Sequence, residues 1–96
     1  MTDLPTRLGV VGAGTMGAGI AQLGCLAGIE TVLYDPFPDA LTKGTESVHK
    51  NIDRGAERGR WSAEDAARAH DLLKQASAPE DFAGSELVID GGFTAI

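Results

Sequence analysis

The stretch GVVGAGTMGAGIAQ, residues Gly9–Gln22, places five glycines within fourteen residues. Glycine weakens strands and helices alike, because its backbone loses the most conformational freedom on folding. The apolar run Leu8–Val11 is typical of a short buried strand. A helical pattern follows from Thr15 to about Ala27, and Gly28 is placed to cap its end. The closely spaced glycines therefore lie in a tight connection between a strand and a helix.

Apolar residues recur at three- and four-residue steps along this predicted helix. The repeat predicts one broad apolar face toward the core, formed by Met16, Ile20, Leu23, Ala27 and their neighbours. Cys25 lies near the inner face, and we interpret it as a small buried residue rather than a nucleophile.

Residues 12–17 fit the pattern G-x-G-x-x-G between the predicted strand and helix. In a dinucleotide site Gly12 permits the tight turn, Gly14 lets a pyrophosphate approach the backbone, and Gly17 allows close packing of helix on strand. The helix N-terminus adds free N–H groups and partial positive charge for the phosphates. The alternative is a glycine turn that serves packing alone.

An acidic residue follows the second predicted strand, Thr31–Tyr34, which Pro36 should end. Asp35 stands 21 residues after Gly14, where a carboxylate can accept hydrogen bonds from both ribose hydroxyls of an adenosine. It would repel a 2′-phosphate, and no arginine follows it directly. The pattern therefore favours NAD over NADP as cofactor.

Two polar helices follow the second strand. The first is expected from Asp39 to about Arg58, weakened by Gly44 and frayed near Gly55 and Gly59, with a thin inner stripe of Leu41, Val48 and Ile52. The second begins at a capping box, with Ser62 as N-cap and Asp65 in the acidic position, and runs to about Lys74. Trp61 directly precedes this box and is expected to be a local packing residue.

Two short strands complete the pattern, a weak one at 73–77 and another at Leu87–Asp90, with a helical turn at 79–82 between them. Strands separated by helices predict an α/β fold with right-handed crossovers. We expect one Rossmann-like domain over residues 1–96, with a parallel sheet of about four strands in the order 3-2-1-4, flanking helices and a helical-pair insertion. The fourth strand would then be an open edge through which the chain could self-associate.

Composition narrows the possible partners. The 96 residues carry 8 Lys+Arg against 14 Asp+Glu, a net charge of −6, which argues against nucleic acid or an anionic membrane as partner. No apolar stretch is long enough to span a bilayer, and no basic patch precedes an apolar run as in a secretory signal. A single cysteine suits a reducing compartment. We therefore expect a cytoplasmic protein.

The remaining candidate residues carry weaker signals. His49 and His70 fall on different predicted helices without metal-ligand spacing, so we expect no metal site and solvated surface histidines, with a catalytic role as the alternative. The charges from Asp53 to Arg60 are expected to form a solvated face. The alternative there is that Arg58 and Arg60 meet a phosphate-bearing substrate.

The segment GAGTMGAGIAQ (12–22) is more specific than the general motif. Together with VLYD (32–35) and LVID (87–90), it resembles the N-terminal domain of the NAD-dependent 3-hydroxyacyl-CoA dehydrogenases, over about residues 7–90. The helical pair at about 39–74 is similar to that family's helical arm. The resemblance implies a role in fatty acid metabolism, with hydride transfer between the 3-hydroxyl of an acyl-CoA, such as 3-hydroxybutyryl-CoA, and NAD. It also implies that the arm contacts CoA, and that NAD is held by Gly12, Ala13, Gly14, Thr15, Met16, Gly17 and Asp35.

Two departures from the family pattern limit what the resemblance implies. After Asp90 the chain reads GGFTAI (91–96) where the family has a segment resembling A-V-x-E, and these last residues resemble the C-terminus of short-chain dehydrogenases/reductases. The family's general base, a histidine paired with a glutamate, falls beyond residue 96, so no residue here is assigned as catalytic. Acyl-CoA is thus a partner only in the full-length family context. The alternatives are a non-catalytic truncated, chimeric or designed Rossmann scaffold, or a dimerising nucleotide-binding module.

Overall fold

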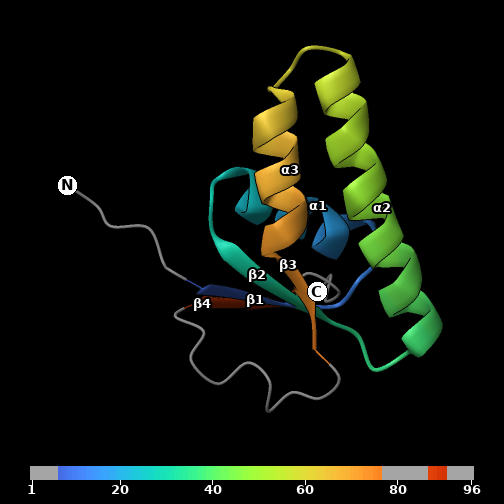
Figure 1. Cartoon of the computed structure of the whole chain (residues 1–96). Helices are drawn as coiled ribbons and strands as arrows, with labels where there is room; N and C mark the ends of the chain where they lie inside the picture. Colours follow the sequence, from blue (N-terminus) through green and yellow to red (C-terminus); the bar gives the residue numbers. More distant parts are fainter. Residues whose placement is uncertain (1–6, 77–86, 91–96) are drawn as a thin grey trace.

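Four parallel strands in the order β3-β2-β1-β4 form the base of the fold (Figure 1). The structure, a computed structural model, describes residues 7–76 and 87–90. The order confirms the predicted Rossmann-like sheet. The strands are β1 (Arg7–Val11), β2 (Glu30–Tyr34), β3 (Leu73–Gln75) and β4 (Leu87–Asp90).

Three helices lie on one side of this sheet in Figure 1. They are α1 (Thr15–Leu26), α2 (Pro38–Glu57) and α3 (Ala63–Leu72). The helices α2 and α3 form an antiparallel hairpin, and α1 contacts both of them as well as β1 and β2. The predicted helical pair is confirmed, and α3 ends two residues before Lys74 because the chain enters β3 there.

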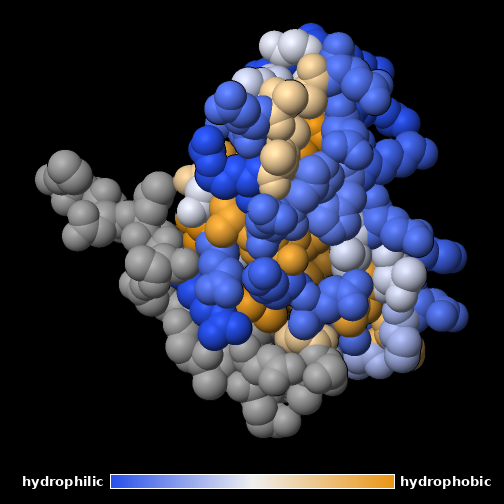
Figure 2. All heavy atoms as spheres, in the orientation of Figure 1, coloured by the Kyte–Doolittle hydropathy of each residue, from blue (hydrophilic) through white to orange (hydrophobic). Residues whose placement is uncertain are grey.

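The core lies between the sheet and the helices. Val10, Leu33, Val48 and Ile52 are completely buried, which confirms most of the inner stripe expected on α2. Figure 2 shows the visible surface of α2 as mainly hydrophilic, a pale stripe of weakly apolar atoms over α3, and more strongly apolar atoms lower down, between the helices and the sheet. Burying these side chains supplies the main driving force for folding. The hairpin thus packs through a narrow apolar stripe, mainly against α1, which in turn lies on the sheet.

The apolar face predicted for α1 was wrong. Met16 and Leu23 are 57% and 68% exposed, whereas the buried residues are Gly17, Ala18, Ala21, Gly24 and Cys25. The reason is that α1 lies close to both the sheet and the hairpin, and large side chains do not fit there. A Cβ on Gly24 would lie 2.6 Å from Thr31 Oγ1 and 2.8 Å from Leu8 Cδ2.

The ends of the helices follow local sequence chemistry. Gly28 adopts a φ of +85° just after the C-cap of α1, as a glycine in this position commonly does. Ser62 Oγ accepts a hydrogen bond from the Asp65 N–H at 3.0 Å, which confirms the predicted N-cap. The fraying expected near Gly55 was wrong, because Gly55 is buried under the Trp61 ring within α2.

Several expectations lie outside the described residues: the N-terminal lead-in, the helical turn at 79–82 and the tail at 91–96. Within the described ranges, none of the helices combines the length and apolar character needed to cross a membrane.

Candidate functional site

The turn from β1 into α1 brings two backbone segments into close contact. Gly12 adopts a φ of +100°, a conformation that L side chains rarely adopt, and its N–H donates to the Tyr34 carbonyl at 2.7 Å. A Cβ on Gly17 would overlap the Gly12 carbonyl group. Two of the three motif glycines are therefore required by the turn itself.

Gly14 is different, because the fold does not require it. Its φ of −71° is open to any residue, and a Cβ there would meet no described atom within 4 Å. Gly14 is the N-cap of α1, yet no described side chain caps the helix, and its first turn carries no acidic residue. The first N–H groups of α1 thus lack intrahelical partners and lie beside an exposed glycine.

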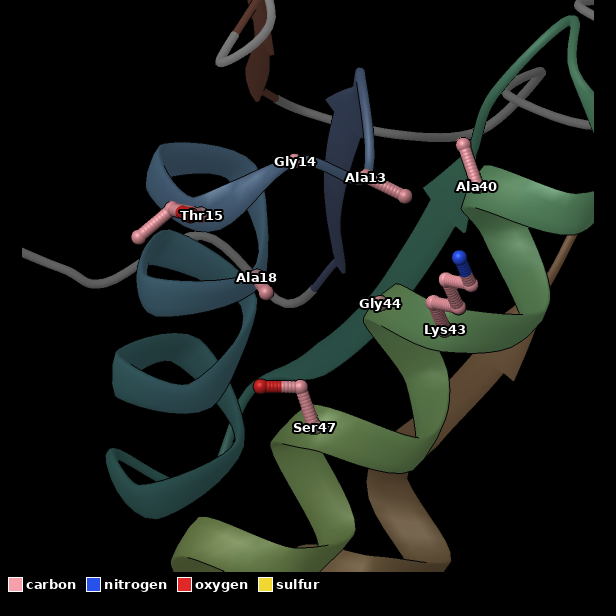
Figure 3. A pocket seen from close by; sticks show the side chains of 8 residues that line it. All are labelled: Ala13, Gly14, Thr15, Ala18, Ala40, Lys43, Gly44 and Ser47. Atoms are coloured by element: carbon pink, nitrogen blue, oxygen red, sulfur yellow. The ribbon is translucent and has the colours of Figure 1, made fainter.

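A pocket of about 310 Å³ lies between this helix end and α2 (Figure 3). The Ser47 hydroxyl points from α2 toward α1, and Lys43 lies one turn earlier on α2. The pocket combines a cationic side chain with the partial positive charge of a helix N-terminus, which suits an anionic ligand. Its lining residues are Ala13, Gly14, Thr15, Ala18, Ala40, Lys43, Gly44 and Ser47.

Helix α2 contacts the glycine turn directly at Gly44. A Cβ on Gly44 would lie 2.7 Å from the Ala13 Cβ and still closer to the Ala13 carbonyl oxygen. Gly44 counted against the prediction of a helix here, and the structure shows its role, which is to let the helix approach the turn. The glycine turn and α2 therefore pack directly against each other at this pocket.

Asp35 lies at the carboxyl end of β2, and its side chain connects the glycine turn with the start of the segment that leads into α2. Its Oδ2 accepts from the Ala13 N–H at 2.9 Å, and its Oδ1 accepts from the Phe37 N–H at 2.8 Å. Each carboxylate oxygen has a further lone pair for a ligand hydroxyl. The structure thus brings together Asp35 and the glycine turn, as expected for a site that holds a ribose and a pyrophosphate.

The fold and the geometry of this turn agree with the sequence comparison. The family profile described as "3-hydroxyacyl-CoA dehydrogenase, NAD binding domain" matches residues 7–94. The chain belongs to this family. Its cofactor is NAD.

The relatives of this chain are much longer proteins than the domain itself. The 3-hydroxybutyryl-CoA dehydrogenase of Mycobacterium tuberculosis is 34% identical over 90 residues, which cover 94% of this chain and 32% of that protein. The 3-hydroxyadipyl-CoA dehydrogenase of Escherichia coli is 35% identical over 81 residues, or 84% of this chain and 17% of that protein. The crystal structure of (S)-3-hydroxybutyryl-CoA dehydrogenase from Ralstonia eutropha matches with a TM-score of 0.87 at 30% identity, over 97% of this chain and 33% of that one. The chain therefore spans about a third or less of the length of these relatives.

This 3-hydroxyacyl-CoA dehydrogenase domain has a second pocket, of about 210 Å³, near the tip of the hairpin. Three arginines line it, so it too suits an anionic ligand. The sequence pattern pointed to two of them as an alternative to a solvated face. The lining residues are Gln22, Asn51, Arg54, Gly55, Arg58, Arg60 and Trp61.

The two histidines of the domain are not separate surface residues, so that expectation was wrong. Their Nδ1 atoms are hydrogen-bonded to each other across α2 and α3, and His70 Nε2 lies 2.7 Å from Asp53 Oδ1. Partial burial and the neighbouring imidazole lower the pKa of His49. Neither histidine lines the two pockets. Within the described part of the chain, no cluster of three or more residues could hold a metal ion.

Cys25 is buried between α1 and β2, as expected for a packing residue. Burial raises the pKa of its thiol to about 11, and a contact with Thr31 offsets part of the rise. A thiol with so high a pKa is almost entirely protonated at neutral pH, so it is a poor nucleophile.

Proposed function

We propose that the chain is the cofactor domain of a 3-hydroxyacyl-CoA dehydrogenase that acts on a short 3-hydroxyacyl-CoA such as 3-hydroxybutyryl-CoA. When bound, NAD accepts the hydride from the 3-hydroxyl carbon of the substrate. The observation that carries the proposal is the uncapped N-terminus of α1 beside the Asp35 carboxylate, at one edge of the sheet. We assign the NAD site to Gly12, Ala13, Gly14, Thr15, Met16, Gly17 and Asp35.

In this assignment the N–H groups at the start of α1 bind the pyrophosphate. Thr15 and Met16 contribute two of them, and both residues are exposed. Gly14 provides the room for the phosphates, since no described atom lies within 4 Å of a Cβ built there. Lys43, in the same pocket, adds a positive charge. The protein thus supplies a preorganised, positively polarised surface.

Asp35 would bind the adenine ribose while keeping its two backbone hydrogen bonds. A carboxylate has about four acceptor sites, and Ala13 and Phe37 occupy one on each oxygen. The same negative charge disfavours the 2′-phosphate of NADP. The proposal therefore includes a preference for NAD.

We assign the acyl-CoA contact to the arginine pocket. This assignment adopts the alternative in which Arg58 and Arg60 contact a phosphate-bearing substrate. Lys43 in the first pocket and Arg58 in the second are separated along α2 by roughly 22 Å at the usual helical rise. The phosphates of CoA at the arginines would therefore not compete with the NAD pyrophosphate beside Lys43. This substrate assignment concerns the whole protein, of which the chain covers about a third in its relatives.

Calorimetric titration of the chain with NAD and NADP, using matched glycine variants, tests the cofactor site. Gly14→Ala should cost about 1 kcal/mol of unfolding free energy, because alanine is a poorer N-cap than glycine, and should weaken NAD binding at least about tenfold, or 1.4 kcal/mol. Gly19→Ala is the control: a Cβ at Gly19 also meets no described atom within 4 Å, but Gly19 lines neither pocket. Equal NAD affinity in wild type and Gly14→Ala would refute the assigned pyrophosphate position. Preference for NADP would refute the role of Asp35.

Among the described strands, β4 pairs only with β1, and this supports a second proposal, self-association through the outer edge of β4. Sedimentation analysis over a range of concentrations should show dimers or larger species. A monomer at the highest concentration would exclude this interface. We also propose a cytoplasmic location, supported by the single cysteine and testable by cell fractionation.

A further inference from the structure

The hydrogen bond between His49 and His70 joins the two arms of the α2–α3 hairpin. It connects the same atom, Nδ1, of both rings, and the ring centroids are 4.7 Å apart. Two identical ring nitrogens can bond only if one carries a hydrogen and the other offers a lone pair. The contact is therefore sensitive to how many protons the two rings hold.

Asp53 determines which ring supplies the hydrogen. Its carboxylate can only accept, so the 2.7 Å contact with His70 Nε2 requires a hydrogen on that nitrogen. A neutral His70 then has a bare Nδ1, and His49 must donate from its own Nδ1–H. In this neutral pair a single hydrogen lies between the two Nδ1 atoms.

We propose that His49 and His70 form a proton-operated latch that holds α3 on α2 and opens when both rings are protonated. The first added proton can go to Nε2 of His49, which leaves the Nδ1 contact intact and gives it a charged donor. The second proton must go to Nδ1 of His70. Two N–H groups and two positive charges then face each other, so the contact breaks.

The other charges near the latch come from few positions. Helix α1, which packs against both arms, has no charged residue along its whole length. Asp53 is the carboxylate in direct contact, and it favours the first proton. The remaining charged groups close to the pair in sequence are exposed on α2, α3 and β3: Glu46, Lys50, Arg68, Asp71 and Lys74.

Nuclear magnetic resonance of the histidine ring nitrogens in the full chain tests the latch without any variant. Near pH 8 we expect the Nδ1–H form of His49 and the Nε2–H form of His70. On acidification the pair should titrate in two coupled steps rather than as two independent groups. Amide hydrogen exchange in α2 and α3 should rise through that second step. Two independent titrations, or hydrogen exchange that does not change through the second step, would overturn the proposal.

Substitutions supply a second test. His49→Gln and His70→Gln remove the coupled step, so the rise in hydrogen exchange at low pH should disappear, whereas Lys50→Gln should leave it unchanged. Asp53→Asn should shift the first step to lower pH, because the carboxylate no longer stabilises the charged pair. If both histidine variants kept the acid-induced rise, the latch would be wrong.

The latch also bears on the arginine pocket, a consequence that rests on the proposed function. Arg54 and Arg58 lie on α2, while Arg60 and Trp61 lie in the connection to α3, so opening the hairpin should spread them apart. Binding of CoA to the full chain should weaken through the second protonation step in wild type but not in His49→Gln. If CoA did not bind at any pH, the proposed function of the pocket would fail and the nitrogen titration would still decide the latch.

Discussion

The carboxylate of Asp35 is hydrogen-bonded to the backbone of Ala13, with 2.9 Å between Oδ2 and N, so the residue expected to hold a ribose also holds the glycine turn. Asp35→Ala should therefore cost the ligand-free protein about 1–3 kcal/mol, because the N–H groups of Ala13 and Phe37 lose their acceptor. Asp35→Asn keeps one acceptor oxygen and should cost less. Urea unfolding of both variants measures these costs.

Asp71→Asn is the control for this series, since Asp71 is an exposed carboxylate in the last turn of α3. It should change the unfolding free energy by no more than about 0.5 kcal/mol. If Asp35→Ala were as stable as wild type, the hydrogen bond to the turn would contribute nothing, and any loss of NAD affinity could be assigned to the ribose alone.

Two glycines of α1 should respond to alanine in opposite directions. A Cβ at Gly17 would overlap the Gly12 carbonyl, so Gly17→Ala should cost about 3 kcal/mol or more, a large part of the stability of a small domain. A Cβ at Gly19 meets no described atom within 4 Å, so Gly19→Ala should gain about 0.5–1 kcal/mol from its higher helix propensity. Urea midpoints measured side by side check both. Similar midpoints for the two variants would contradict the close contact between α1 and the turn.

Cys25 should make the protein less stable in alkali. Its pKa is about 11 in the folded chain against an ordinary value of 9.0, so above about pH 9 the unfolded chain releases a proton that the folded chain keeps. Proton release stabilises the unfolded state relative to the folded one, so the unfolding free energy falls as pH rises from about 9 toward 11. Thermal unfolding across this range should show the decline, and Cys25→Ala should remove most of it. A thiol reagent should react with the native protein far more slowly than with the urea-unfolded chain.

Trp61 and Gly55 form a pair suited to a double-mutant cycle. Trp61→Phe loses the hydrogen bond from Nε1 to the Ile52 carbonyl, 2.9 Å in length, and should cost about 1 kcal/mol. Gly55→Ala places a methyl group into the indole ring and should cost more. In a Trp61→Ala background that clash is absent, so Gly55→Ala should become nearly neutral. Additive costs across the cycle would show that the ring does not lie on Gly55.

Much of the fold could be predicted because local chemistry and topology agreed. The strand before Gly12, the helix after Gly14 and Asp35 at the end of the second strand have the spacing of a dinucleotide-binding fold, and the structure places them as expected. The cap at Ser62 was equally visible, because a side-chain cap depends on neighbours a few residues away.

The errors concern contacts between residues distant in sequence. His49 and His70 meet only because of the antiparallel pairing of α2 with α3, and no spacing rule along the chain indicates that pairing. The outward placement of Met16 and Leu23 likewise depends on how closely three elements surround α1. Helical periodicity locates an apolar stripe, but here the tightest packing selects the smallest residues instead of the most apolar ones.

The contact of Gly44 with Ala13 extends the dinucleotide motif beyond its usual limits. Gly44 lies 27 residues after Gly17 and on another helix, yet its missing side chain is needed for the turn to hold its shape. The glycine turn therefore cannot be grafted alone into another protein. Without a glycine at the facing helix position, a side chain there would distort the turn. Because the nearest atom is the Ala13 carbonyl oxygen, no substitution at position 13 can make room, so a larger residue at position 44 should be tolerated only where the turn or the helix shifts.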